Sequence, residues 1–167
     1  MAVAQPHSFS GQGFSLQGDK GRFVLPPQFR KTVKDSSGNA KTLCLAKHDR
    51  WKCLTGFGLS RTEAFADRLD REEMLAAQTG KDFDRDKRAS QLFGFVEVPF
   101  DDSGRFLLPP HLAELAGVGD QLYFQGAGEF FTIWAPDQLA AMDDGWEGAQ
   151  ASCVHLAAEA ANRARKA

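Results

Sequence analysis

The hydrophobic and polar positions of this 167-residue chain follow the same order twice. In residues 19–27 an Asp-x-Gly-Arg turn leads into three apolar residues and two prolines, and residues 102–110 repeat that order 83 positions later. After a connection that is four residues shorter in the second copy, the match resumes at an offset of 79, so that Leu54 corresponds to Ile133. Two copies are too few for a solenoid. They predict instead a pseudo-two-fold domain in which each copy supplies half of one core.

Each copy predicts the same series of elements. A short strand precedes the turn, most clearly at residues 95–98, and Asp and Gly are residues that turns favour. The apolar residues after the turn continue as a second strand, which the two prolines end before they start a short helix at 28–33 or 111–116. A hairpin follows, with a tight turn near His48 in the first copy. The hairpin strands are expected at residues 42–46, 51–54, 121–124 and 130–134.

One such unit is too small to fold alone. A unit of about 45 residues is marginal without help, because it buries too little apolar surface. Two interlocking units would share one core. The sequence therefore predicts a mixed α+β fold, mainly β, in which the two repeats close one barrel and helices flank it.

Helices are expected after each hairpin. Ser60 and Glu63 form a capping-box pattern, which predicts a helix from Ser60 to about residue 77. A second helix is expected at 82–92, and another opens near Pro136 and resumes after Gly145. Three apolar side chains of the first helix are expected to point inward: Phe65, Leu69 and Met74. The divisions that result are repeat 1 at 11–58, a helical insert at 59–93, repeat 2 at 94–137 and a C-terminal helical tail at 138–167.

The charge of the chain is divided unequally between the copies. The formal net charge is −2, which by itself argues against a polyanionic partner. Residues 19–58 nevertheless contain nine basic and three acidic side chains, a local charge of +6, whereas residues 102–136 contain one basic and four acidic side chains, a local charge of −3. Because the distribution of charge sets the local potential, the first copy is a candidate surface for a polyanion.

Other chemistry has little support in the sequence. The four histidines stand in unrelated contexts, no pair has metal-ligand spacing, and no catalytic residue or cofactor motif is found. No apolar run is long enough to span a membrane, and the N-terminus does not read as a secretory signal. Cys44, Cys53 and Cys153 are expected to be reduced packing residues, the first two in strands and the third on a helix.

The repeated turn admits a structural and a functional interpretation. What the copies share indicates architecture: the two aspartates would cap their turns and pair with the arginine three residues later. What differs between the copies indicates a ligand surface, since Arg and Lys at strand tips can contact phosphates. The shared turn residues are Asp19, Gly21, Asp102, Gly104 and Arg105. The candidate DNA-binding residues are Lys20, Arg22, Arg30 and Lys31.

These motifs carry a resemblance. Asp-x-Gly-Arg before an apolar strand, Pro and a short helix is similar to the SpoVT–AbrB domain, and two such copies joined by a helical insert resemble the MraZ family. The run Leu122–Trp134 also resembles that family's second hairpin. Arg85, Arg88 and residues 92–94 resemble the segment that precedes the second copy in that family. The resemblance extends over about residues 9–142.

The resemblance implies a swapped-hairpin β-barrel and a cytoplasmic, nucleoid-associated transcription factor. Members of the family form rings of many subunits that bind short direct repeats in double-stranded DNA near the division and cell-wall gene cluster. By position, the DNA-contacting loop would fall on Lys20 and Arg22, with Arg30 nearby.

Two alternatives keep the fold and change its role. AbrB-type barrels also occur in antitoxins, whose disordered tail wraps a toxin, although the tail here is alanine-rich and helix-like. The third interpretation is a protein-interaction scaffold that works through the acidic second copy and the helices.

Overall fold

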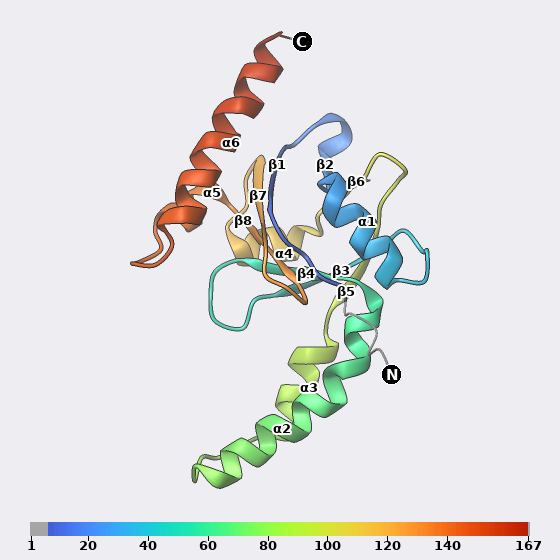
Figure 1. Ribbon diagram of the computed structural model, residues 1–167, viewed down its shortest axis with the longest axis vertical. Coiled ribbons are helices and arrows are strands. Elements are labelled where there is room, and N and C mark those ends of the chain that lie inside the picture. Colours follow the sequence, from blue (N-terminus) through green and yellow to red (C-terminus); the bar gives the residue numbers. More distant parts are fainter. Residues whose placement is uncertain (1–6, 167) are drawn as a thin grey trace, which may run out of the picture.

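In the computed structural model, which describes residues 7–166, a six-stranded antiparallel sheet lies at the centre of the molecule (Figure 1). In spatial order its strands are β1 (Gln12–Leu16), β7 (Gln121–Gly126), β8 (Phe131–Trp134), β4 (Leu54–Phe57), β3 (Thr42–Lys47) and β5 (Val96–Pro99). A second sheet pairs β2 (Phe23–Val24) with β6 (Arg105–Phe106). The mixed α and β class is confirmed. The strand order runs from β1 at one edge to β5 at the other, and the described strands form no closed barrel.

The strand pairing crosses between the two repeats. β1 of the first repeat pairs with β7 of the second, and the equivalent strand β5 pairs with β3 of the first. At the centre of the sheet Leu54 lies opposite Ile133, its own counterpart, and in the small sheet Phe23 lies opposite Phe106. A pseudo-two-fold axis therefore passes through both sheets, as the repeat predicted.

The prolines start the two short helices of the repeats. α1 (Pro27–Ser36) and α4 (Pro110–Ala116) each have proline at the first helical position, where the missing N–H costs nothing. α4 ends at Gly117, whose φ of 67° suits a glycine C-cap. Both helices bury apolar side chains in the main core, which contains Phe29 and Leu112.

The first hairpin differs from the prediction. Its second strand runs over Leu54–Phe57, so residues 51–53 belong to the loop and Cys53 lies just before the strand. The His48 side chain organises this loop, because its Nδ1 accepts hydrogen bonds from the backbone N–H groups of Arg50 and Trp51. The sequence predicted a tight turn here. The structure has instead a longer loop, in which the histidine side chain accepts hydrogen bonds from two backbone N–H groups.

The insert forms a helical hairpin, and the predicted capping box is wrong. A 3₁₀ segment, η2 (Leu59–Ala64), precedes α2 (Phe65–Gln78), and the Ser60 hydroxyl lies 2.5 Å from the Ser36 hydroxyl of α1 instead of capping a helix. α3 (Arg85–Phe93) begins after Asp84, whose carboxylate accepts the N–H of Lys87. Phe65 and Leu69 of α2 are buried as predicted, but Met74 is 61% exposed, because it lies in the second half of α2 and the buried residues of this helix are in its first half.

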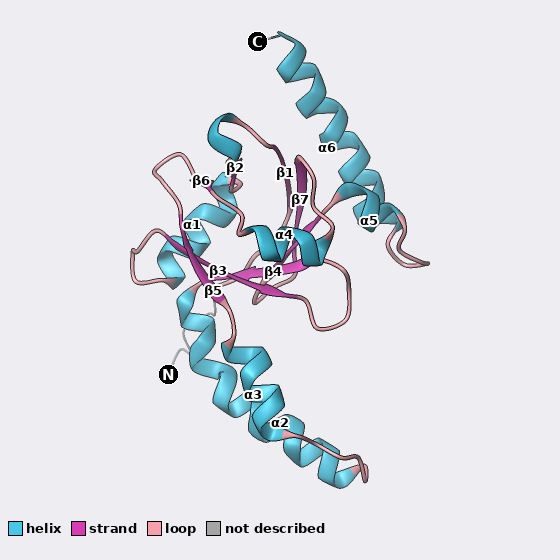
Figure 2. Ribbon diagram, turned by 180° about the vertical axis from the view of Figure 1, so that it is seen from behind, coloured by secondary structure: helices cyan, strands magenta, loops and turns pink. Residues whose placement is uncertain are grey.

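The C-terminal helices cover another part of the sheet. α5 (Pro136–Ala140) and α6 (Glu147–Lys166) lie beside β1 and β7, at the opposite end of the molecule from α2 and α3 (Figure 2). Trp134 packs there against Trp51 and Trp146. The three cysteines are buried and free, as predicted, and burial raises the pKa of each thiol: to about 12 for Cys44 and Cys53 and to about 11 for Cys153.

Candidate nucleic-acid interface

The small β2–β6 sheet forms a two-stranded ribbon with a buried face and an exposed face. Phe23 and Phe106 point into the main core and are only 2% and 1% exposed. Because side chains alternate along a strand, the residues on either side of each Phe point outward. These outward residues are Arg22, Val24, Arg105 and Leu107. Val24 and Leu107 are equivalent in the two repeats and are 39% and 59% exposed, so the ribbon presents two arginines and two apolar side chains to solvent.

Each strand of the ribbon is preceded by the repeated turn. Gly21 and Gly104 both adopt positive φ, 71° and 82°, which explains the glycine at these positions. In the first turn Lys20 also has a left-handed backbone, with φ of 60°, and its side chain is exposed. Lys20 therefore lies within the first turn, three residues before Phe23 of β2, with its side chain in solvent.

The carboxylate that organises the second turn is Asp101, and the predicted pairing of Asp102 with Arg105 is wrong. Asp101 accepts the N–H groups of Ser103 and Arg105, and its Oδ2 lies 2.7 Å from Nε of Arg105. These bonds lower the pKa of Asp101, chiefly through the backbone N–H of Arg105. The same Oδ2 lies 3.8 Å from Nη1 of Arg22. One carboxylate thus faces both outward arginines.

Asp19 and Asp102 do not make the predicted pairs. Within the described residues, the Asp19 side chain has no recorded bond to Arg22; the Nε of Arg22 instead donates to the Asp19 carbonyl at 3.3 Å. The Asp102 carboxylate lies 2.7 Å from Nζ of Lys41. Asp101 takes over the turn because its position, which is Gly18 in the first copy, is the one that faces the turn's backbone N–H groups.

Arg30 braces the second turn from α1. Its guanidinium donates to the carbonyls of Leu25 and Asp102, at 3.2 and 3.3 Å. The guanidinium also lies against Gly104, where an added Cβ would come within 2.5 Å of Nε. That Nε is buried without a hydrogen-bond partner among the described residues. The Arg30 side chain is thus engaged within the protein.

Lys31 occupies a different surface from the ribbon arginines. It lies on the exposed side of α1 and pairs with Asp35 one turn later, at 2.8 Å, in a contact that raises the pKa of Lys31. The structure therefore brings Lys20 and Arg22 together at the ribbon, places Arg30 beneath the second turn, and leaves Lys31 on α1. Four further residues at the ribbon and its turns did not stand out as site residues in the sequence: Asp101, Lys41, Val24 and Leu107. The Gly18-to-Asp101 difference between the copies was the available signal.

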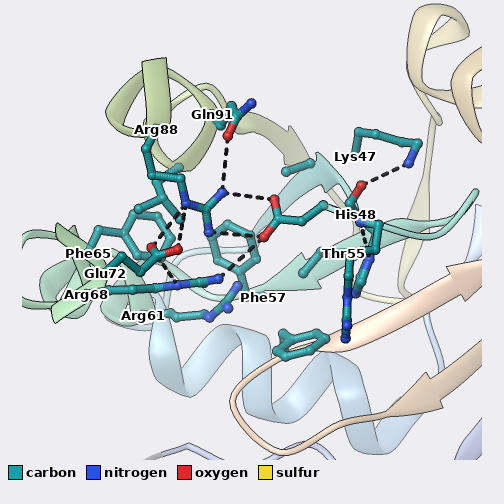
Figure 3. Close-up of a pocket in the computed structure, with 15 residues that line it drawn as sticks. Lys47, His48, Thr55, Phe57, Arg61, Phe65, Arg68, Glu72, Arg88 and Gln91 are labelled. Carbon is teal, nitrogen blue, oxygen red and sulfur yellow. Dashed lines mark hydrogen bonds and ion pairs between the residues drawn. The ribbon is translucent and has the colours of Figure 1, made fainter. Parts of the chain in front are cut away.

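The arginines of the insert are also engaged within the chain. Arg85 pairs with Asp70 and Glu73, at 3.0 and 3.4 Å. Arg88 is only 12% exposed and pairs with Asp49 and Glu72, both at 3.1 Å. These pairs hold α3 to α2 and to the loop of the first hairpin, as Figure 3 shows for Arg88.

Residues 7–166 contain neither a metal-binding cluster nor a membrane-spanning helix. No group of three or more His, Cys, Asp or Glu residues in this range could hold a metal ion. No helix in the same range is both long enough and apolar enough to cross a membrane.

Comparisons with known proteins identify the family. Models of protein families give no match. The transcriptional regulator MraZ of Parvibaculum lavamentivorans is 37% identical over 136 residues, which cover 81% of this chain and 80% of the relative. MraZ regulators of a Roseiflexus species and of Rhodospirillum rubrum are each 32% identical, over 75% and 73% of this chain. Matches of this identity over most of both chains show that the chain belongs to the MraZ family of transcriptional regulators.

Proposed function

We propose that this protein is a DNA-binding transcriptional regulator that contacts double-stranded DNA with the outward face of the β2–β6 ribbon. The observation that carries the proposal is the position of Arg22 and Arg105 on one ribbon, where their side chains are 26% and 47% exposed, with the exposed Lys20 in the first turn. A two-stranded ribbon has the dimensions to enter the major groove. Arginine can bond the phosphates or read guanine there, and exposed apolar side chains such as Val24 and Leu107 can contact thymine methyl groups.

The two halves of the ribbon are electrostatically unequal. Asp101 neutralises Arg105 closely, at 2.7 Å, and reaches Arg22 only at 3.8 Å. The first repeat therefore supplies the stronger attraction for phosphate. Arg30 and Lys41 of the first repeat hold the acidic second turn, so part of the first repeat's positive charge is neutralised within the protein. In this proposal Lys20 and Arg22 contact DNA directly, Arg30 positions the ribbon, and Lys31 contributes to the local potential.

A single ribbon offers only a few phosphate contacts. Such a site alone would bind at about 10⁻⁴–10⁻⁶ M, the range of non-specific binding. A ring of several chains on short direct repeats would add avidity of roughly 10²–10⁴ without new contacts. We propose such a ring because it combines several weak sites into specific recognition. We also propose that the operator lies at the division and cell-wall gene cluster and that the protein is cytoplasmic and associated with the nucleoid.

The fold proposal follows the same symmetry. The exchange of β1 and β5 between the repeats supports a swapped-hairpin, AbrB-like arrangement. We propose the boundaries that the sequence repeat suggested: repeats at 11–58 and 94–137, the insert at 59–93 and the tail at 138–167.

Salt-dependent DNA binding tests the proposed function. For the Arg22→Ala variant we expect weaker binding to the protein's own upstream DNA, and a plot of log K against log salt whose slope is smaller by about 1, the loss of one phosphate contact. Fluorescence anisotropy over a salt series measures both quantities. The matched control is Arg105→Ala at the equivalent position, for which a smaller loss is expected because Asp101 already neutralises that arginine. Unchanged affinity and slope for Arg22→Ala would contradict the proposal.

A further inference from the structure

A pocket of about 470 Å³ lies between the first hairpin and the insert, and its lining carries excess positive charge (Figure 3). Five basic side chains line it: Lys47, Arg50, Arg61, Arg68 and Arg88. Only two acidic side chains do so, Asp49 and Glu72. His48 also lines the pocket, and burial lowers its pKa, so it adds no charge at neutral pH. The formal charge of the lining is therefore +3.

The two carboxylates of the pocket are already committed. Asp49 and Glu72 receive hydrogen bonds from Arg88 at 3.1 Å. Arg68 reaches the same two carboxylates at 3.4 and 3.6 Å. Because the carboxylates of Asp49 and Glu72 already accept hydrogen bonds from Arg88, they have little capacity left to accept from another arginine of the lining.

Three basic side chains of the lining form no ion pair among the described residues. Lys47 donates to two backbone carbonyls and Arg50 lies over Trp51, which leaves Arg61. Its guanidinium lies over three aromatic rings, 4.9 Å from the centroid of Phe57, 5.6 Å from Phe65 and 4.8 Å from Phe130. Among the described residues its side chain has no recorded hydrogen bond or ion pair, and its nitrogens are not among the buried atoms that lack a partner, so its donors open into the pocket. Burial, with a further contribution from the nearby charge of Arg68, lowers the pKa of Arg61 to about 10, although the charges of Glu129 and Asp49 act in the opposite direction.

Aromatic rings stabilise a cation but satisfy none of its N–H donors. A partly desolvated guanidinium gains most from a planar acceptor, which it binds through two parallel hydrogen bonds. Figure 3 shows Arg61 and Arg68 extending along the same wall of the pocket. We propose that the pocket binds a small free oxyanion of the phosphate type between Arg61 and Arg68, and that this site is separate from the DNA interface.

The position of the pocket supports that separation. The pocket is lined by residues of β3, β4, the loop between them, η2, α2 and α3, with Phe130 beside them. The ribbon β2–β6 lies on the other side of the central sheet in both views (Figures 1 and 2). DNA held on the ribbon would therefore leave the pocket open to a ligand from solution.

Calorimetric titration with inorganic phosphate tests the site, at constant ionic strength set with chloride. The full chain is expected to bind one phosphate with an apparent Kd on the order of 1 mM or tighter. Arg61→Gln is expected to weaken binding at least about tenfold, a change of 1.4 kcal/mol. The matched control, Arg85→Gln in the same insert, is expected to bind as the unaltered protein does, because Arg85 pairs with Asp70 and Glu73 away from the pocket.

A second measurement does not depend on the variant's folding. In the unaltered protein, the ¹⁵Nε resonance of the Arg61 side chain is expected to shift saturably with phosphate, while that of Arg85 stays in place. Absence of saturable binding, or equal binding by Arg61→Gln, would overturn the proposal. A loss of DNA affinity in Arg61→Gln would overturn it as well, because the pocket would then hold a backbone phosphate. The Arg22→Ala experiment is independent of all three results.

Discussion

Asp101 is one of two positions at which the copies of the turn differ by a unit of charge; the other is Lys20, which is Ser103 in the second copy. Its counterpart is Gly18, so only the second turn has a carboxylate at this position. The carboxylate serves the fold, because it accepts two backbone N–H groups of its own turn. It also faces both ribbon arginines and so competes with any phosphate for them. One side chain therefore stabilises a turn and weakens the proposed interface.

These two roles of Asp101 can be separated. Asp101→Asn keeps an oxygen that can accept the N–H groups of Ser103 and Arg105 but removes the charge. We expect DNA affinity to rise on the order of threefold to tenfold, the size of one added phosphate contact, and the salt dependence to steepen. Anisotropy titrations measure both, with Asp102→Asn as the control, since Asp102 faces Lys41 instead. An unchanged affinity would show that Asp101 does not restrain the arginines.

The glycines of the two turns offer a matched pair for stability. Both have positive φ, but an added Cβ at Gly104 would meet the Arg30 guanidinium at 2.5 Å, whereas at Gly21 the nearest atom is Nε2 of Gln17 at 3.4 Å. Backbone strain alone should make Gly21→Ala cost about 1–2 kcal/mol of unfolding free energy. Gly104→Ala should cost about 1 kcal/mol more, because it also displaces Arg30. Urea denaturation measures the difference.

The same pair tests the role of Arg30. In an Arg30→Ala background we expect the two alanine substitutions to become equally costly, since the side chain that distinguishes them is gone. If Gly104→Ala remained the more costly substitution, the contact with Arg30 would not be the cause.

At the scale of elements, the insert is attached to the first hairpin by a small core and one ion-pair network. Phe57 of β4 packs edge-on against Phe65 of α2 at 5.9 Å, and Cys44 and Leu92 join the same cluster. Asp49, in the hairpin loop, is the link between the loop and both helices, because it pairs with arginines of α2 and α3. The rest of the helical hairpin projects into solvent.

Asp49→Asn is therefore expected to loosen the insert and leave the sheet intact. Amide hydrogen exchange in α2 and α3 should quicken, while the loss of global stability stays below about 1 kcal/mol, because the Asp49 side chain is 48% exposed. Hydrogen exchange read out by mass spectrometry measures the change. Asp70→Asn, which removes a more exposed partner of Arg85, is the control and should have less effect. Equal protection of α2 and α3 in Asp49→Asn and the unaltered protein would contradict this role.

The pH dependence of the insert has the same origin. Burial raises the pKa of Asp49, but the hydrogen bonds and charge of Arg88, with Arg68, outweigh burial and hold that pKa below its ordinary value of 3.8. The stabilisation by this group is therefore fully present above pH 3.8 and is lost as the pH falls through the lower value of the folded state. Protection of α2 and α3 should decline in that range in the unaltered protein, and Asp49→Asn should lack this part of the decline.

At the scale of the whole molecule, neither repeat has a complete sheet of its own. β1 is bonded only to β7 of the other repeat, and β5 only to β3. The main core likewise combines both repeats, for example in the stacking of Phe29 on Phe131 with ring centroids 4.8 Å apart. Each half therefore depends on the other for backbone pairing and for burial.

Separated halves are expected to be unfolded. Fragments 1–93 and 94–167, expressed apart, should show no cooperative thermal transition, because each lacks the partner strands and about half of the core. Mixing them in equal amounts should restore the circular dichroism of the intact chain, since the strands that exchange need no covalent link. Cooperative unfolding of either fragment alone would contradict the interlocked description.

The sequence by itself determined the architecture of the repeat. A nine-residue pattern that recurs at a constant offset predicts the same elements in both copies, and the glycine turns and the proline-started helices follow from it. The pattern also made Leu54 and Ile133 equivalent, whereas their pairing across the sheet came from the structure. Composition and charge also identified the first repeat as the more basic one. The family resemblance rested on the same residues, and relatives of up to 37% identity confirm it.

Only the tertiary structure decided what each charge does. Repetition relates positions within the two copies, but Arg30 meets Gly104 across them, and Asp101 meets Arg22 in the same way. The loop around His48 depended on a local side-chain acceptor that a hydrophobic pattern does not record. The Arg61 pocket arises where the insert meets a hairpin. Ion pairs and pockets of this kind depend on distances between segments far apart in the chain, and such distances exist only after the two repeats have interlocked.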